Sequence, residues 1–248
     1  MCLIALAYKV HPRFPFIIAT NRDEFHDRAA APAAFWRDAP DLLAGRDLQA
    51  GGTWMGITRS GRFAAVTNFR DLHHPRPAGP SRGMLVLQAL EQGVDAQATD
   101  VYAGFNLLYG PLDALRYHNN IQPADTPLSS GVHALSNEFL DGPWPKVQRA
   151  KAALELVLAR PVDHLVPGLF DLLMDDATAP DDLLPDTGLP NDLERAVSSI
   201  FIRTPGYGTR CSTVILVGQE GRVRFEERSW PEGRRVVEEF IVAGMPWN

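Results

Sequence analysis

The sequence predicts an α+β fold in which antiparallel strands from both ends of the chain share sheets and helices cover the outside. Its elements run in the order β-rich, helical and β-rich again, with no internal repeat and no linker between two cores. The 248 residues are 45% hydrophobic and 22% charged, an ordinary globular composition. A chain of this length buries a substantial core. We therefore expect one domain over residues 1–248.

The first seventy residues read as a four-stranded meander. Residues 3–10 and 14–20 are apolar, β-prone runs that predict a hairpin of two buried strands. The hairpin is expected to end in the polar cluster Asn21–Glu24. Residues 29–40 are rich in Ala and Pro and predict an extended surface loop. Two further strands are expected by residue 67.

The middle and end of the chain predict helices followed by a second meander. Ser81 is suited to cap a helix that runs to about residue 92. Apolar residues at helical spacing, with Pro145 in the first turn, predict a helix over residues 144–158. The remaining expected elements are a hairpin (105–118), a short strand (132–135), two helices (165–174 and 192–200) and a closing meander (213–241).

Composition argues against several classes of function. The net charge of −6 is the wrong sign for a general binder of nucleic acid. Two distant cysteines provide neither a disulfide framework nor a paired metal motif, and the seven histidines show no His-x-x-x-His spacing, so a zinc hydrolase is disfavoured. The first apolar run is too short for a signal peptide, and no run approaches the length of a membrane span. We expect a cytoplasmic protein without a membrane span.

Cys2 follows the initiator methionine directly and is the most informative single residue. Removal of Met1, which a residue as small as cysteine permits, would give Cys2 a free α-amino group. An α-amine has a pKa near 7.7–8.0 and is able to act as base for the neighbouring thiol. Position 2 is thus the one place where a cysteine acquires its own base. The alternative interpretation is a small, buried apolar residue in a strand.

Several further segments carry a resemblance to a known family. They read MCLIALAY, IIATNRDEF, GGTWMGI, AAVTNF, ALSN, WPKV and PGYGTRCSTVIL. Together they resemble the NRDE family, also named after transport and Golgi organisation protein 2. That family is similar in fold to N-terminal-nucleophile (Ntn) hydrolases, in particular the cysteine branch that includes choloylglycine hydrolase and penicillin V acylase. The resemblance implies a four-layer αββα fold with two packed antiparallel sheets.

The resemblance also implies roles for five residues. Cys2 matches the nucleophile, and Asp23 matches a carboxylate that orients the α-amine. Asn68 and Asn137 match asparagines of an oxyanion hole, and Arg210 matches an arginine that tunes the charge of the thiol. Asparagine amides are suitable donors to a developing oxyanion, and a guanidinium lowers the pKa of a nearby thiol. Each residue also has a structural interpretation, as a helix cap (Asp23), a strand end (both asparagines) or an ion pair (Arg210).

Four more residues are predicted to belong to the motif and pocket: Asn21, Arg22, Glu24 and Trp54. The hydrolases carry an arginine where this chain has Thr20, and Arg22 is expected to point away from Asn21 and Asp23 because side chains alternate along a strand. Gly51-Gly52 before Trp54 allows a tight turn and a close backbone approach. The pattern is that of a structural turn or of a pocket wall with Trp54 as an aromatic platform.

The resemblance leaves two functions open. The first is a cysteine amidohydrolase that cleaves linear, non-peptide amides of small molecules. The second is a non-catalytic carrier, since the family is associated with haem trafficking. Candidate axial ligands for haem are His73, His74, Met84 and Cys2. No C-x-x-C-H motif is present, so any haem would be held non-covalently.

Overall fold

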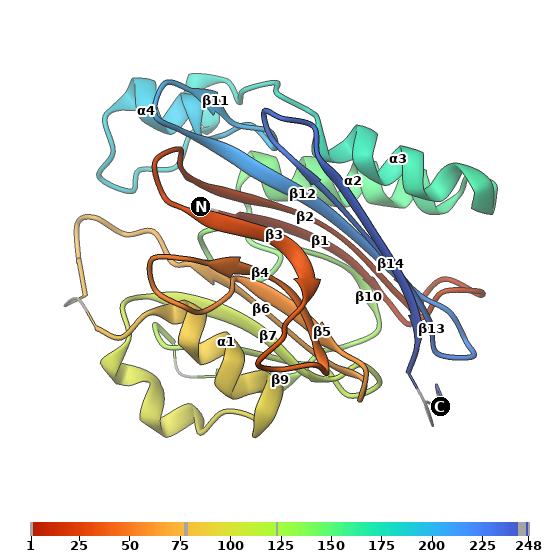
Figure 1. Ribbon diagram of the computed structural model, residues 1–248. Coiled ribbons are helices and arrows are strands. Elements are labelled where there is room, and N and C mark those ends of the chain that lie inside the picture. The colour runs from red at the N-terminus through yellow and green to blue at the C-terminus, as the bar shows by residue number, and fades with distance from the viewer. Residues whose placement is uncertain (1, 77–78, 123, 243–246, 248) are drawn as a thin grey trace.

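The chain forms four layers in the order helix, sheet, sheet, helix (Figure 1). The computed structural model describes residues 2–76, 79–122, 124–242 and 247. Within these residues, two seven-stranded antiparallel sheets face each other, and helices cover the outer face of each. The predicted α+β class and the four-layer order are confirmed.

Strands from both ends of the chain make up the first sheet. Its order is β10-β1-β2-β12-β13-β14, and the short β11 pairs with β12. The strands span Cys2–Tyr8 (β1), Phe16–Phe25 (β2), Gly131–Leu135 (β10), Arg203–Thr204 (β11), Tyr207–Val217 (β12), Arg222–Ser229 (β13) and Arg235–Ile241 (β14). The N-terminal hairpin therefore lies against the C-terminal meander, as the sequence predicts.

The second sheet is a meander formed by consecutive strands. Its order follows the sequence from β3 to β9. The strands span Ala30–Phe35 (β3), Leu42–Asp47 (β4), Met55–Thr58 (β5), Arg62–Asn68 (β6), Phe105–Pro111 (β7), Arg116–Asn119 (β8) and Ala124–Pro127 (β9). Most of its connections are short, which suits antiparallel neighbours.

The helices divide between the two outer layers. Helices α2 (Pro145–Leu158) and α3 (Leu165–Leu173) pack on the first sheet, and α1 (Arg82–Glu91) packs on the second (Figure 1). Ser81 caps α1 as predicted, because its Oγ accepts a hydrogen bond from the amide of Gly83 at 3.2 Å. In the part of the chain that the structure describes, the other helical segments are α4 (Asn191–Ala196) and three 3₁₀ turns (Ala96–Val101, Val162–His164 and Asp181–Leu183).

The apolar run of β1 follows from its burial on both faces. Leu3, Ala5 and Ala7 pack toward the helices, whereas Ile4 and Leu6 pack into the core between the sheets. A strand between two apolar layers needs a continuous run of apolar residues rather than an alternating one. Full burial of each leucine or isoleucine contributes about 1.5–3 kcal/mol.

Two predictions for the first seventy residues are wrong. Residues 29–40 contain strand β3, which accommodates Pro32 because it is an edge strand with a register shift between Ala31 and Ala34. The expected single meander is divided between the sheets, since β1 and β2 belong to the first sheet and β3–β6 to the second.

Helix α4 is shorter than the predicted span of residues 192–200. The hydroxyl of Ser198 donates to the carbonyl of Arg195 at 2.7 Å, and that of Ser199 donates to the carbonyl of Phe201 at 2.8 Å. Such local side-chain bonds compete with helical ones and favour an early end.

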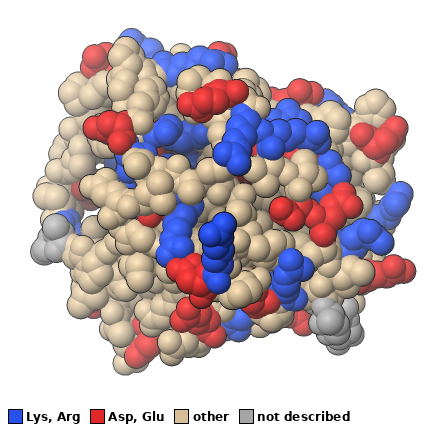
Figure 2. Space-filling model, in the orientation of Figure 1, with Lys and Arg blue, Asp and Glu red and all other residues tan. Residues whose placement is uncertain are grey.

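The surface of the molecule mixes both signs of charge. Basic and acidic side chains are interspersed on the face that Figure 2 shows. Among the described helices, none combines the length and the apolar character needed to cross a membrane.

Candidate functional site

The NRDE tetrapeptide lies within a strand, so its side chains alternate between two environments. β2 continues to Phe25 because β12 pairs along its whole length. Arg22 shares a face with Ile18, which packs between the sheets. Asn21 faces the helical layer, where its amide reaches the carbonyl of Leu173 at 2.8 Å.

Both cysteines lie beside Arg22 on the inter-sheet face. Cys2 on β1 and Cys211 on β12 are each directly opposite Arg22 in the register of the sheet. Residues opposite each other on neighbouring strands project on the same face. Cys2 and Cys211 are therefore two strand spacings apart, about 9.5 Å between Cα atoms, beyond the reach of a disulfide. Both thiols are free.

Cys2 opens on a cavity of about 400 Å³ between the ends of the two sheets. Cys2 and Arg22 line it from the first sheet, and Trp54 and Asn68 line it from the second. The N-terminal end of α1, including Arg82, closes another side. The volume lies at the small end of the range for small-molecule sites.

The Cys2 thiol is held in its neutral form by its surroundings. Burial is the main factor that raises its pKa, and the charge of Asp23 acts in the same direction. The backbone amide of Asp23 hydrogen-bonds to the sulfur and, with the charge of Arg22, opposes this rise. A thiol in this state needs a base before it acts as a nucleophile. The hydroxyl of Ser136 donates to the Cys2 carbonyl at 3.1 Å and fixes the backbone at this position.

Asp23 is a buried carboxylate on the helix-facing side of β2. Its side chain accepts a hydrogen bond from the hydroxyl of Thr209 at 2.7 Å. Burial raises its pKa, and the charge of Lys146 is the largest influence in the opposite direction. Asp23 thus interacts through its charge with the buried cation Lys146, and through its backbone amide with the Cys2 sulfur. Its carboxylate accepts from Thr209 rather than capping the turn after β2.

Lys146 is a functional candidate that the sequence analysis did not identify. Its side chain is 3% exposed, and its ammonium donates to the carbonyl of Val197 at 3.0 Å. Burial lowers its pKa to about 8, and the charges of Asp23 and Cys2 oppose this fall. A signal was present in the sequence, because Lys146 is spaced by four from Ala150 on the apolar stripe of α2. A lysine on a buried stripe needs a partner.

Asn21 has a structural role. Its amide donates to the carbonyls of Leu173 at 2.8 Å and Ile200 at 2.9 Å, and its oxygen accepts from the hydroxyl of Ser212 at 2.6 Å. The side chain is fully buried. Asn21 therefore joins the sheet to the helical layer instead of lining the cavity.

Arg22 and Trp54 form a stacked pair between two cavities. The guanidinium carbon lies 4.2 Å from the centre of the indole ring, a cation–π geometry. Both residues line the Cys2 cavity and also a smaller one that contains Cys211. The preceding glycines allow this arrangement, since Gly51 has φ +78° and a Cβ on Gly52 would lie 2.4 Å from the backbone of Gly83.

The two asparagines predicted for an oxyanion hole have different environments. Asn68 lines the cavity, and its carboxamide forms no hydrogen bond with any other residue that the structure describes. Asn137 is fully buried, and its amide donates to the backbone carbonyl of Asn68 at 2.8 Å. Asn68 is thus available to a ligand, while Asn137 holds the end of β6 in place.

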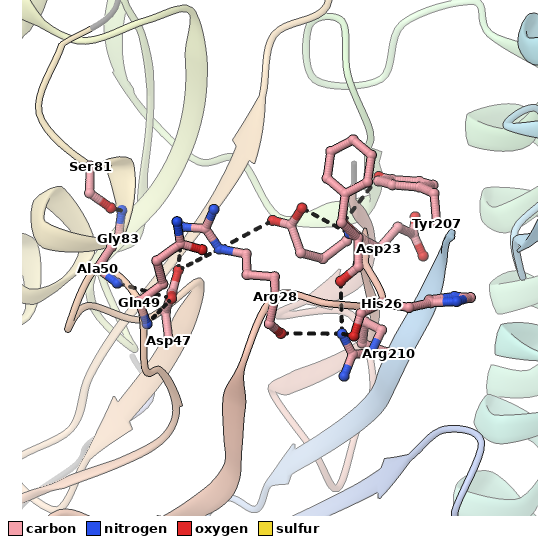
Figure 3. A network of polar contacts seen from close by, with 12 residues as sticks. Asp23, His26, Arg28, Asp47, Gln49, Ala50, Ser81, Gly83, Tyr207 and Arg210 are labelled. Carbon is pink, nitrogen blue, oxygen red and sulfur yellow. Dashed lines mark hydrogen bonds and ion pairs between the residues drawn. The ribbon is translucent and has the colours of Figure 1, made fainter. Parts of the chain in front are cut away.

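Arg28 and Asp47 belong to a polar network beside the cavity (Figure 3), and Glu24 also lines this cavity. Arg28 donates twice to one oxygen of Asp47, at 2.9 and 2.7 Å, and lies 3.7 Å from Glu24. Asp47 also accepts from the backbone amides of Gln49 and Ala50. Asp47 therefore neutralises Arg28.

Arg210 does not line the Cys2 cavity. A register shift between Thr209 and Cys211 directs the side chain of Arg210 away from the cavity. Its guanidinium donates to the carbonyls of Phe25 at 2.8 Å and His26 at 3.0 Å (Figure 3). The arginines that do line the cavity, besides Arg28, are Arg22 and Arg82. The hydroxyl of Thr20 donates to the carbonyl of Leu3 at 2.7 Å.

The four candidate haem ligands are dispersed. His73 pairs with Asp186 and His74 with Asp71, both on exposed loops. Met84 lies on α1 and lines a different cavity from Cys2. These residues do not form an axial pair around one cavity, so they do not fit a two-ligand haem site. Within the described ranges, no group of three histidine, cysteine or acidic side chains is placed to hold a metal ion.

The fold and the site define a four-layer α+β protein with a cavity that Cys2 helps to line. The chain belongs to the transport and Golgi organisation 2 family, whose model matches residues 1–232. It is 34% identical to the human transport and Golgi organization protein 2 homolog, over 92% of this chain and 93% of that protein. It is 28% identical to transport and Golgi organization protein 2 of Drosophila melanogaster, over 92% of each chain.

Two solved structures show similarity to this chain. One is a Caenorhabditis elegans ortholog of N-acylethanolamine-hydrolyzing acid amidase, with a TM-score of 0.45, 11% identity and coverage of 87% of this chain and 92% of that chain. The other is a mutant conjugated bile acid hydrolase from Clostridium perfringens, with a TM-score of 0.45, 8% identity and coverage of 97% of this chain and 92% of that chain.

Proposed function

We propose that the protein, once Met1 is removed, is a cysteine amidohydrolase that acts on linear, non-peptide amides of small molecules. One observation carries the proposal: the Cys2 thiol opens on a cavity of about 400 Å³ that it shares with Arg22 and with the unengaged amide of Asn68. A nucleophile, a cation and an oxyanion donor thus line one cavity. These are the groups that acyl transfer requires.

The reaction follows from these groups. The α-amine of Cys2 takes the proton of the thiol, and the sulfur attacks the amide carbonyl to form a carbon–sulfur bond. Asn68 donates to the oxyanion that develops. The α-ammonium then gives its proton to the leaving amine as the carbon–nitrogen bond breaks. Water attacks the resulting thioester, which yields the carboxylic acid and restores the thiol.

An acylation experiment tests the proposal. The processed protein is incubated with a library of N-acyl amides and with an activated acyl ester, and adducts are located by mass spectrometry. We expect a single acyl group on Cys2 and none on buried Cys211. A form that keeps Met1 should not be acylated at a comparable rate, because its Cys2 lacks a free amine. Processed protein that forms no adduct and cleaves no amide would contradict the proposal.

Lys146 is expected to influence the pH at which kcat/KM falls on the acid side of the pH profile. Asp23 must be ionised to hold the α-ammonium, and Lys146 is the main charge that opposes the rise of its pKa on burial. Lys146→Met removes this charge and keeps the apolar stem. The pKa of Asp23 then rises further, so the acid limb of the pH profile of kcat/KM moves to higher pH. A pH profile of kcat/KM measures the shift.

Lys151→Met is the matched control. Lys151 lies on the same helix but is paired with Asp141 at 2.9 Å, away from the cavity. Its profile should coincide with that of the unmodified protein. A Lys146→Met protein that folds normally and keeps its acid limb in place would show that Lys146 does not act through Asp23.

A further inference from the structure

The arginines that line the Cys2 cavity differ in their ion pairs. Arg28 is neutralised by Asp47, and Asp23 is bonded to Thr209 and faces the charge of Lys146. Glu24 lies 3.7 Å from Arg28. The acidic residues of the cavity are therefore each placed beside a cation or a donor.

Neither Arg22 nor Arg82 forms an ion pair within 4 Å among the described residues, although the charge of Arg22 opposes the rise that burial causes in the pKa of Asp23 and Glu227, and the charge of Glu24 acts on Arg82. Arg22 is only 5% exposed and contacts the face of Trp54, which leaves its N–H groups without an acceptor in the described chain. Arg82 donates to the carbonyl of Gly104 at 2.9 Å and forms no ion pair there. A buried guanidinium has five donors and is costly to leave unpaired.

The first turn of α1 adds to the positive potential at the same place. Ser81, Arg82 and Gly83 all line the Cys2 cavity, and α1 has ten residues. The N-terminus of a helix carries a partial positive charge and favours anions. Two guanidiniums without a close ion pair and a helix N-terminus thus line the same cavity as the thiol.

We propose that Arg22, Arg82 and the start of α1 form an anion subsite that selects amides with a carboxylate within a few bonds of the scissile carbonyl. The proposal rests on the proposed function and names its substrate class. Cys2 and both arginines line one cavity of about 400 Å³, so the bound anion has to lie close to the reacting carbon. A guanidinium binds a carboxylate through paired N–H groups.

Three amides with matched chain length test the proposal. An N-acylglycine carries the carboxylate on the amine side, and a monoamide of succinic acid carries it on the acyl side. An N-acylethanolamine is the neutral comparison. We expect kcat/KM for one of the two anionic amides to exceed that of the neutral one by at least about tenfold. The preferred anionic amide identifies the side on which the carboxylate binds.

Arg82→Met should remove this preference, and Arg62→Met serves as its control. Arg62 also donates to a backbone carbonyl, that of Ala89 at 3.0 Å, but it lies at the other end of α1 and outside the Cys2 cavity. We expect Arg82→Met to lower kcat/KM for the anionic amide at least about tenfold more than for the neutral one. Should Arg82→Met fail to fold, Arg82→Lys keeps the charge, loses the paired donors and should give an intermediate loss.

Binding to the Cys2→Ala protein separates this inference from the proposed function. Calorimetry measures N-acylglycine, the succinic monoamide and N-acylethanolamine at low and high salt, without any need for turnover. Tighter binding of an anionic amide that weakens with salt and with Arg82→Met supports the subsite. Equal binding or equal turnover of all three amides overturns it, even where the neutral amide is cleaved and the proposed function holds.

Discussion

Replacing Cys2 by alanine is expected to abolish amide hydrolysis, with a fall in kcat of about 1,000-fold or more. The reason is that the sulfur forms the only covalent bond to the acyl group in the proposed reaction. Steady-state kinetics on an amide that the processed protein cleaves would measure the loss. Cys2 is at the first position of β1 and half-buried, so its truncation should leave thermal stability nearly unchanged.

Cys211→Ala is the matched control for this experiment. Cys211 is opposite the same arginine as Cys2 but lines the neighbouring cavity. Its removal should leave kcat close to that of the unmodified protein. Activity that survives in Cys2→Ala and disappears in Cys211→Ala would show that the reaction takes place in the cavity lined by Cys211. That result would refute our mechanism.

Replacing Asn21 by leucine is expected to destabilise the fold by about 3 kcal/mol or more. The change leaves the carbonyls of Leu173 and Ile200 and the hydroxyl of Ser212 without their partner in a fully buried place. Each unsatisfied group carries a desolvation cost. For a chain of this length, the loss corresponds to a fall in Tm of about 10 °C, which calorimetry or thermal denaturation measures.

Asn191→Leu controls for the substitution itself. Asn191 is exposed at the start of α4, and its replacement should change Tm little. A stable Asn21→Leu protein that has lost binding or activity would show that Asn21 contacts the ligand instead of joining two layers. The first residue of the NRDE motif would then be functional, contrary to its placement in the structure.

Local patterns of the sequence predicted much of the fold. The buried strand β1, the capped helix α1 and the amphipathic helix α2 are each encoded by spacing and by terminal residues, which need no distant partner. The edge strand β3 was not predicted, because alanine and proline are poor strand formers and only pairing with β4 holds them extended.

The candidate site was predicted in part. Cys2, Arg22, Asp23, Glu24, Asn68 and Trp54 line one cavity, as the motifs suggested. Arg210 lies beside the neighbouring cavity and Asn137 lies behind Asn68, because a bulge and a side-chain bond determine their positions. Lys146 and Arg82 were missed, since both come from helices whose approach to β1 depends on the packing of whole layers.

The sequence by itself determined the family and the class of fold, and it indicated the cysteine that lines the candidate site. These follow from residue type and local spacing, which are fixed along the chain. The tertiary structure alone decided which charges surround that cysteine. The pairing of β2 with β12 joins residues that are far apart in the sequence. The register of β2 with β1 places Arg22 opposite Cys2, and the bulge in β12 directs Arg210 away from the Cys2 cavity. Such long-range register depends on how buried faces pack, and no local pattern specifies it.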